Sequence, residues 1–421
     1  MLEKTNLQNG LRILTFPQDS SESLCVLVLV GTGSKNETKE QNGISHFLEH
    51  MFFKGTTKRP TPVAVAEALD CVGGAYNAFT SEDYTGYYAK VDGRHFELAL
   101  DWVSDIFLSS LLPVEEIEKE KGVVMEELHM RNDSPMSRAQ ILWSQLLYGD
   151  QPAGWNIVGT KESIAKLRRQ DLVSYMGSQY VASNTVVCLA GKLPPNAKEY
   201  AAKRFGAISA TDFRHKAQVL EDQTEPGVLT EDRNTDQVHL CLGVRAYPIS
   251  HPWRYVQEIL ATVLGGMMSS RLFTEVREKR GLAYYISTDS ETNPETGFLM
   301  TAAGVRKENA EDAVRVILDE YRKTAQAPIP TEELQKAKDN STGKLALSLE
   351  SSDAKASFYG TQELLEQNTY TLEEICDKIN AVTQEDIMKL AQDIFRPAKI
   401  NLALLGLSPD HKRLQSILAT I

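Results

Sequence analysis

The pattern of apolar and polar positions in the first half of the chain predicts strands alternating with helices. Residues 11–16 alternate in polarity and 24–30 are almost continuously apolar, so we expect these two segments to form a strand pair. Extended segments are also expected within 75–91, and a buried strand over 185–189. Apolar side chains at helical spacing predict helices over 44–52, 62–72, 96–109, 113–131, 137–147 and 163–179.

The same order of elements begins again after a polar stretch at 218–234. A strand is expected at 238–244 and a helix at 252–264, and 400–405 is the counterpart of the buried strand at 185–189. We therefore predict an internal duplication. The expected domains are 1–217 and 235–421, joined by a linker at 218–234. Each domain is predicted to be α+β, with a mainly antiparallel sheet and helices packed on one face.

Composition excludes several classes of protein. The chain has 421 residues, and 45 Lys and Arg against 57 Asp and Glu give a net charge of −12. This balance argues against nucleic-acid binding, which needs a basic surface. The longest apolar run is too short to span a bilayer, so no membrane segment is expected. The N-terminus lacks the pattern of a secretory signal, and the five scattered cysteines suggest a reducing compartment, so we expect a cytoplasmic protein.

The predicted helix at 44–52 carries the residues with the clearest chemistry. His46 and His50 are separated by four positions, so they share a helix face and can bind one metal ion. Imidazole suits zinc. Glu49 reaches the same side and is placed to act as the general base that takes a proton from the attacking water. The order H-x-x-E-H is the inverzincin motif.

Catalytic zinc usually has three protein ligands, and the predicted helix 113–131 is the best source of the third. Glu120 and Glu127 are seven positions apart and border its apolar stripe, whereas Glu126 points away. We assign Glu127 as the third ligand and Glu120 as a hydrogen-bond partner that fixes the tautomer of a ligand histidine. The alternative is that both glutamates are solvated charges paired with neighbouring Lys or Arg side chains.

Several segments together resemble the M16 family of inverzincin peptidases, which includes pitrilysin, insulysin and the mitochondrial processing peptidase. NGISHFLEHMFFKGT is similar to the motif helix and its flank, and Glu127 follows the motif after 76 residues. GGAYNAFTSEDYTGYYAKV resembles the family's substrate-binding edge strand, and GMMSSRLFTEVREKRGLAY its second-half segment with an Arg/Tyr pair. The length is similar to that of the short, two-domain subfamily. The resemblance implies the LuxS/MPP-like metallohydrolase fold, with one Zn²⁺ per chain.

The resemblance also implies a substrate and a partner. Asn77, Ala78 and Phe79 would lie on the edge strand that pairs with an extended peptide, and Arg277 and Tyr284 would contact the substrate carbonyls. In short members of the family, two chains close around a chamber, so a homodimer is expected. The Arg/Tyr pair of one chain would then serve the zinc of the other.

Two other functions stay open on the sequence alone. One is a non-catalytic core subunit of a larger complex, although such proteins usually have a damaged zinc motif. The other is a zinc subunit that needs a different, inactive partner. Because the metal motif and the Arg/Tyr pair stand in one chain, we predict a zinc-dependent endopeptidase that acts on peptides or unfolded segments.

Overall fold

A computed structural model describes residues 2–406 and 410–421, and the chain divides into two compact units. Each unit is assembled from three separate stretches of sequence. The first unit comprises Met1–His129, Trp155–Ala217 and Ala346–Tyr370. The second comprises Met130–Gly154, Gln218–Leu345 and Thr371–Ile421. Each half of the sequence therefore contributes a segment to the unit formed mainly by the other half.

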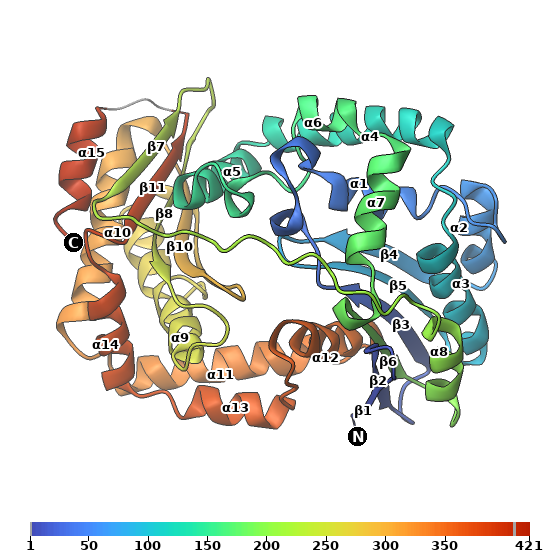
Figure 1. The fold of residues 1–421 in the computed structure, drawn as a ribbon. Helices are drawn as coiled ribbons and strands as arrows, with labels where there is room; N and C mark the ends of the chain where they lie inside the picture. The colour runs from blue at the N-terminus through green and yellow to red at the C-terminus, as the bar shows by residue number, and fades with distance from the viewer. Residues whose placement is uncertain (1, 407–409) are drawn as a thin grey trace. The chain divides into compact units, whose positions relative to one another are not determined.

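The first unit is built on a six-stranded mixed sheet (Figure 1). Its strands are β1 (Glu3–Asn6), β2 (Arg12–Pro17), β3 (Ser23–Val30), β4 (Ala75–Thr80), β5 (Thr85–Asp92) and β6 (Thr185–Gly191). The order is β1-β2-β6-β3-β5-β4, and only β2 and β6 run parallel. The expected pairing of 11–16 with 24–30 is wrong, because β6 lies between them and pairs with both. Strand β6 is buried along its whole length, which favours a central place.

Both faces of this sheet are covered, which explains why β3 is apolar at almost every position. On one face, Val26 and Val28 pack into the core that includes helix α3 (Phe96–Ser109). On the other face, Cys25 and Leu27 pack with residues of helix α12 (Ser352–Glu366). The prediction of helices on one face only is therefore wrong for this sheet. The second face is covered by a helix from the other half of the sequence (Figure 1).

The second unit repeats this plan with five strands. They are β7 (Gly227–Glu231), β8 (Val238–Ala246), β9 (Ala283–Thr292), β10 (Gly297–Val305) and β11 (Ile400–Leu405). The order β7-β11-β8-β10-β9, with β7 and β11 parallel, matches β2-β6-β3-β5-β4 strand for strand. Strand β7 lies within the stretch predicted to be an irregular linker, and it is the counterpart of β2. The predicted α+β class is confirmed, with mixed sheets in both units.

Helices also cover both faces of the second sheet. Helix α5 (Pro135–Tyr148) packs its Trp143 against β10 residues Phe298 and Met300. From the opposite side of β10, Thr301 bonds to Tyr321 of helix α10 (Ala310–Gln326). The other helices are α1 (Ile44–Met51), α2 (Pro62–Asp70), α4 (Val114–Asp133), α6 (Lys161–Lys166), α7 (Arg169–Gln179), α8 (Ala197–Phe205), α9 (Arg254–Leu264), α11 (Thr331–Ser348), α13 (Leu372–Asn380), α14 (Gln384–Ile394) and α15 (His411–Leu418).

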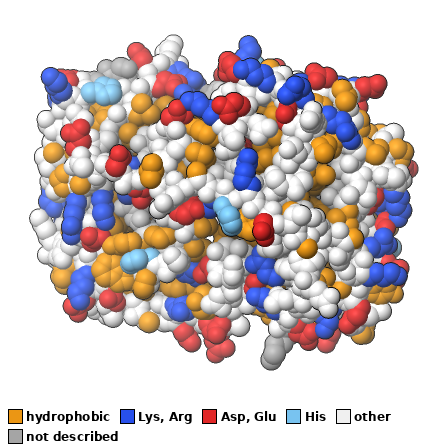
Figure 2. Space-filling view, in the orientation of Figure 1, with side chains coloured by type: hydrophobic (Ala, Val, Ile, Leu, Met, Phe, Trp, Pro, Cys, Tyr) orange, Lys and Arg blue, Asp and Glu red, His pale blue; other side chains and the backbone are white. Residues whose placement is uncertain are grey.

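The surface mixes charges of both signs. On the face shown in Figure 2, acidic and basic side chains are interspersed, so the negative net charge does not gather there into one large field. Among residues 2–406 and 410–421, no helix has the length and apolar content needed to cross a membrane.

Candidate metal centre

Helix α1 carries the H-x-x-E-H motif and is anchored by its apolar face. Phe47, Leu48 and Met51 are fully buried in the core of the first unit. That anchoring places the two motif histidines together, with ring centres 4.6 Å apart. His46 is only 5% exposed, while His50 is half-buried. The spacing of four residues therefore gives the shared face that the sequence predicts.

Helix α4 brings a carboxylate to both imidazoles. Glu127 Oε2 lies 3.3 Å from His46 Nε2 and 3.6 Å from His50 Nε2. One candidate ligand atom from each of these three residues lies within 4.8 Å of the others. Two imidazoles and a carboxylate are a donor set that suits zinc and leaves a fourth position for water. His46 Nδ1 is buried and has no hydrogen-bond partner, so the second nitrogen of that ring, Nε2, is the one directed at the cluster.

Glu120 holds the other side of His50. It is almost fully buried and lies 2.8 Å from His50 Nδ1, while Lys54 Nζ lies 2.6 Å from its second oxygen. A proton kept on Nδ1 leaves the Nε2 lone pair of His50 free for a metal. Burial acts to lower the pKa of His50, but the bonds to Glu120 and Glu127 outweigh it and raise the pKa to about 9. Metal binding at His50 must therefore displace a proton.

The same balance acts on Glu120 in the opposite direction. Burial acts to raise the pKa of this carboxyl, but its bonds with His50 and Lys54 outweigh burial and lower the pKa. Glu120 is thus an ionised buried carboxylate with partners on both oxygens, the condition under which such a group is tolerated in a protein interior.

Glu49 lies on α1 between the two histidines and is tied to the sheet. The hydroxyl of Thr80, the last residue of β4, donates a hydrogen bond of 2.5 Å to Glu49 Oε2. This bond holds one of the two carboxylate oxygens of Glu49. Sequence reasoning missed both Thr80 and Lys54, although each stands inside a segment quoted for the family resemblance.

Asn77, Ala78 and Phe79 lie in β4, which is an edge strand of the first sheet and packs against α1. Within the described residues, β4 pairs only with β5. Asn77 is exposed, and its side-chain oxygen accepts from the backbone N–H of Ala78. The free edge of β4 offers main-chain groups to an extended peptide.

Arg277 and Tyr284 belong to the second unit. Arg277 stands in a π-helix, Phe273–Glu278, with its guanidinium 4.8 Å from the centre of the Phe273 ring. Tyr284 is the second residue of β9 and is 75% exposed. The structure therefore brings together the three candidate ligands, Glu120 and Glu49, and it places the Arg/Tyr pair in the other unit.

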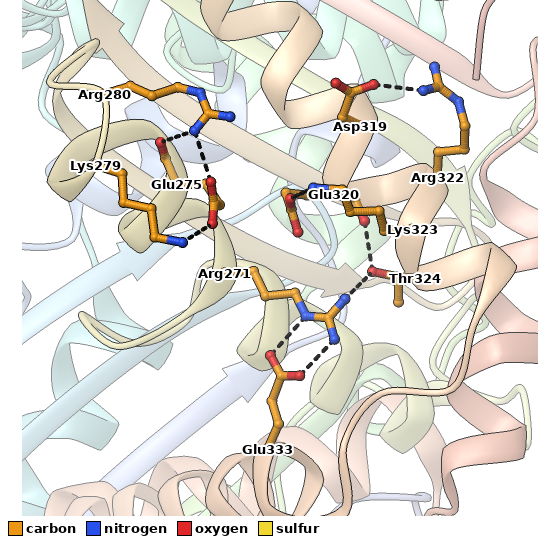
Figure 3. Close-up of polar contacts among 10 residues, drawn as sticks. All are labelled: Arg271, Glu275, Lys279, Arg280, Asp319, Glu320, Arg322, Lys323, Thr324 and Glu333. Carbon is orange, nitrogen blue, oxygen red and sulfur yellow. Dashed lines mark hydrogen bonds and ion pairs between the residues drawn. The ribbon is translucent and has the colours of Figure 1, made fainter.

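Ion pairs hold the π-helix at both ends (Figure 3). Before it, Arg271 forms two parallel bonds of 2.8 and 2.7 Å with the Glu333 carboxylate of α11. Within it, Glu275 pairs with Lys279 at 2.6 Å and with Arg280 at 2.9 Å. Bidentate Arg–carboxylate pairs are directional, so this pair ties the turn before the π-helix to α11.

The His–His–Glu cluster of this two-sheet α+β chain, with a further glutamate beside it, has the donor set of a zinc site. Comparison with known proteins agrees. The family described as "Insulinase (Peptidase family M16)" matches residues 12–161, and "Peptidase M16 inactive domain" matches residues 166–341. The uncharacterized zinc protease YmxG of Bacillus subtilis is 38% identical over 94% of this chain and 96% of its own length.

Another relative, an uncharacterized zinc protease of Mycobacterium leprae, is 34% identical over 96% of this chain and 91% of its own. The chain therefore belongs to the M16 peptidase family, as its sequence predicts.

Solved structures show the same fold at lower identity. A protease from Helicobacter pylori superposes with a TM-score of 0.89 at 23% identity, over 97% of this chain and 99% of that one. A chain of complex III2 from Candida albicans superposes with a TM-score of 0.84 at 18% identity, over 99% and 100%. At these identities the likeness concerns the fold alone.

Proposed function

We propose that this protein is a zinc-dependent endopeptidase that hydrolyses peptides or unfolded segments. The observation that carries the proposal is the cluster formed by His46, His50 and Glu127, with ligand atoms within 4.8 Å of one another. Glu49 lies on α1, the helix that also carries His46 and His50. Membership of the M16 family and two relatives named as zinc proteases support the same function.

Each residue near the cluster has a distinct role in the proposed reaction. His46, His50 and Glu127 would hold one zinc ion, which supplies a Lewis acid that polarises the scissile carbonyl and lowers the pKa of water towards roughly 7. Glu49 takes the proton of the attacking water and delivers it to the leaving amine. Thr80 orients Glu49 for this transfer through its bond to Oε2.

The substrate is proposed to bind as an added strand. Main-chain groups of Asn77–Phe79 on the β4 edge would pair with the peptide next to α1, which carries Glu49. Arg277 and Tyr284 are proposed to contact substrate carbonyls and to stabilise the oxyanion of the tetrahedral intermediate. The pair lies in the second unit and the candidate ligands in the first. As the resemblance to short M16 peptidases implies, we propose a homodimer in which the pair acts on the zinc site of the partner chain.

Replacing Glu49 by Gln tests the proposed chemistry directly. The variant keeps the size of the side chain and all three ligands, so it should bind zinc at wild-type stoichiometry. Loss of the base should lower kcat on a peptide by at least about 100-fold. Glu126→Gln is the matched control, because Glu126 is 82% exposed and lies outside the cluster. Near-normal cleavage by the Glu49→Gln chain would remove the assignment of the base.

The fold also occurs in a chain of complex III2, so a non-catalytic core subunit is the second candidate. The geometry of the metal cluster argues for the enzyme, because a scaffold has no need for three ligands with a buried carboxylate behind one of them. Elemental analysis separates the two: about one zinc per chain is expected of the peptidase. A metal-free protein that stays inactive after zinc is added would favour the scaffold.

A further inference from the structure

Glu37 is a buried carboxylate that the proposed chemistry does not use. It follows the short 3₁₀ turn at Ser34–Asn36, precedes α1 in the sequence and is only 5% exposed. Its Oε2 accepts from the Gly43 N–H at 2.7 Å and from the Asn42 amide at 2.9 Å. Its Oε1 accepts from the Ser45 N–H at 2.9 Å. All three of these donors stand at the beginning of α1 or immediately before it.

Helix α1 cannot be capped in the usual way. The first N–H groups of a helix need acceptors, which an N-cap Ser, Thr, Asp or Asn side chain normally supplies. The N-cap of α1 is Gly43, at φ 92°, and a Cβ there would stand 2.4 Å from the carbonyl oxygen of Val158. No side chain fits at this position without strain. Glu37 supplies the missing acceptors from six residues upstream, and its negative charge complements the helix dipole.

This arrangement is costly for a role in stability alone. The partners of the Glu37 carboxylate named above are neutral, and burial raises the pKa of Glu37 to about 7 despite those hydrogen bonds. A neutral acceptor would avoid much of the penalty of burying a charge. Perturbed buried carboxylates of this kind gather at functional sites.

Glu37 binds the part of α1 that immediately precedes the residues of the metal cluster. Ser45, whose N–H it binds, is followed by His46, and Glu49 comes one turn later. The Ser45 hydroxyl is also bonded to the Tyr175 hydroxyl of α7 at 2.8 Å. The start of α1 is thus held through both backbone and side chain. Because α1 has only eight residues, a shift at its first turn moves the histidines and Glu49 together.

We propose that Glu37 is a positioning residue of the active site: by binding the N–H groups of Gly43 and Ser45 it fixes where α1 starts, and so it sets the places of His46 and Glu49. This inference rests on the proposed peptidase function. A displacement of about 1 Å at a catalytic group can cost roughly 100-fold in rate, which gives such a residue a measurable effect.

The test compares Glu37→Gln with Glu363→Gln. The side-chain amide of the Glu37→Gln variant has one acceptor oxygen where the carboxylate has two, so one N–H of α1 loses its partner. Glu363 is a matched control in the same unit: it is 1% exposed, sits on α12 behind the opposite face of the sheet, and is paired with Lys4 and Arg12. Three quantities are measured: the thermal midpoint, the zinc affinity against a competing chelator, and kcat and KM on a peptide.

Glu37→Gln should lower kcat by roughly 10- to 100-fold and weaken zinc binding by roughly 10-fold, with KM changed by less than about threefold. Glu363→Gln should lower the thermal midpoint and leave zinc affinity and kcat at wild-type values. A Glu37→Gln chain that is less stable but has normal kcat and zinc affinity would overturn the proposal, since Glu37 would then be structural only.

Glu37→Asp keeps the inference testable if Glu37→Gln does not fold. It keeps both carboxylate oxygens but shortens the side chain by one methylene, so the bonds to the Gly43 and Ser45 N–H groups cannot both keep their length. We expect a smaller loss in kcat, roughly three- to tenfold, and an unchanged kcat would again count against the proposal. Zinc affinity is measured against a chelator and does not require that the protein cleaves a peptide. A wild-type protein that binds zinc but cleaves no peptide would therefore end the proposed function, while the comparison of zinc affinities would still decide the role of Glu37 in placing His46.

Discussion

One position on α4 decides which carboxylate can reach the metal. Glu127 lies against both histidines, whereas the adjacent Glu126 is 82% exposed. Glu127→Gln should weaken zinc binding by at least about 100-fold and abolish most peptide cleavage, because a neutral amide replaces one of three ligands. Glu126→Gln should leave both within about twofold. Zinc titration of the two metal-stripped variants is the measurement, and equal affinities would contradict the assignment of Glu127.

The sequence predicts the residues that one helix period brings together, and misses those that need tertiary structure. His46 and His50 follow from a spacing of four, and Glu127 follows from the face it shares with Glu120. The partner of Glu49 is not predictable in this way, because Thr80 is 31 residues away in a strand. Glu37 is missed for a similar reason: it acts on α1 from a loop, without a helix period to reveal it.

At the level of elements, the π-helix at Phe273–Glu278 is the least ordinary feature of the second unit. In a π-helix each backbone N–H bonds to the carbonyl five residues earlier, one residue further than in an α-helix, and side-chain periodicity in the sequence does not reveal this. Short π-helical segments are often found at functional sites, and this one carries Arg277. Arg271, two residues before the segment, is paired with Glu333 of α11 (Figure 3), and we expect this pair to support the π-helix.

Breaking the Arg271–Glu333 pair should shift the position of Arg277, although Arg277 itself is not substituted. Arg271→Gln leaves Glu333 without its bidentate partner in a partly buried place, so we expect kcat/KM on a peptide to fall by roughly tenfold. Lys389→Gln is the control, because Lys389 is 54% exposed and forms a surface pair with Glu385 on α14, outside the π-helix. Adding Glu333→Gln to Arg271→Gln should restore part of the loss, since no unpaired charge then remains. A wild-type kcat/KM in Arg271→Gln would show that the pair does not support the π-helix.

The sequence predicts where strands lie along the chain better than it predicts which strands pair with one another. The segments 24–30, 185–189 and 400–405 all lie within strands, because long buried apolar runs leave few alternatives. Pairing depends on contacts between distant segments, and the apolar pattern is the same for any neighbour. The sequence therefore does not predict that β6 lies between β2 and β3, or that the short β7 inside the polar stretch 218–234 is a strand.

At the scale of the whole chain, duplication is combined with an exchange of helices. Helix α12 from the second half covers the first sheet, and α5 from the first half covers the second sheet. An amphipathic pattern shows that a helix needs an apolar partner, but it does not show which of two similar sheets provides it. The predicted boundaries at 217 and 235 remain predictions about sequence domains, whereas the compact units are discontinuous.

The homodimer is tested by mixing two inactive chains. Glu49→Gln removes the base in the first unit, and Arg277→Ala removes the proposed substrate contact in the second. If the pair of one chain serves the zinc of the other, a mixed dimer has one complete site, built from the zinc site of the Arg277→Ala chain and Arg277 of the Glu49→Gln chain. Random exchange then restores about a quarter of wild-type activity, since about half of the dimers are mixed and each has one of two sites.

The control mixture contains Glu49→Gln and Glu127→Gln chains. Both changes damage the zinc site of their own chain, so no mixed dimer has a complete site and activity should stay at the level of the separate variants. Before activity is compared, the mass in solution must show a dimer. Co-purification of differently tagged chains must then show that the subunits exchange. If exchange is complete and the Glu49→Gln and Arg277→Ala mixture stays inactive, Arg277 does not act across the dimer. A protein that is monomeric while fully active would exclude the chamber formed by two chains.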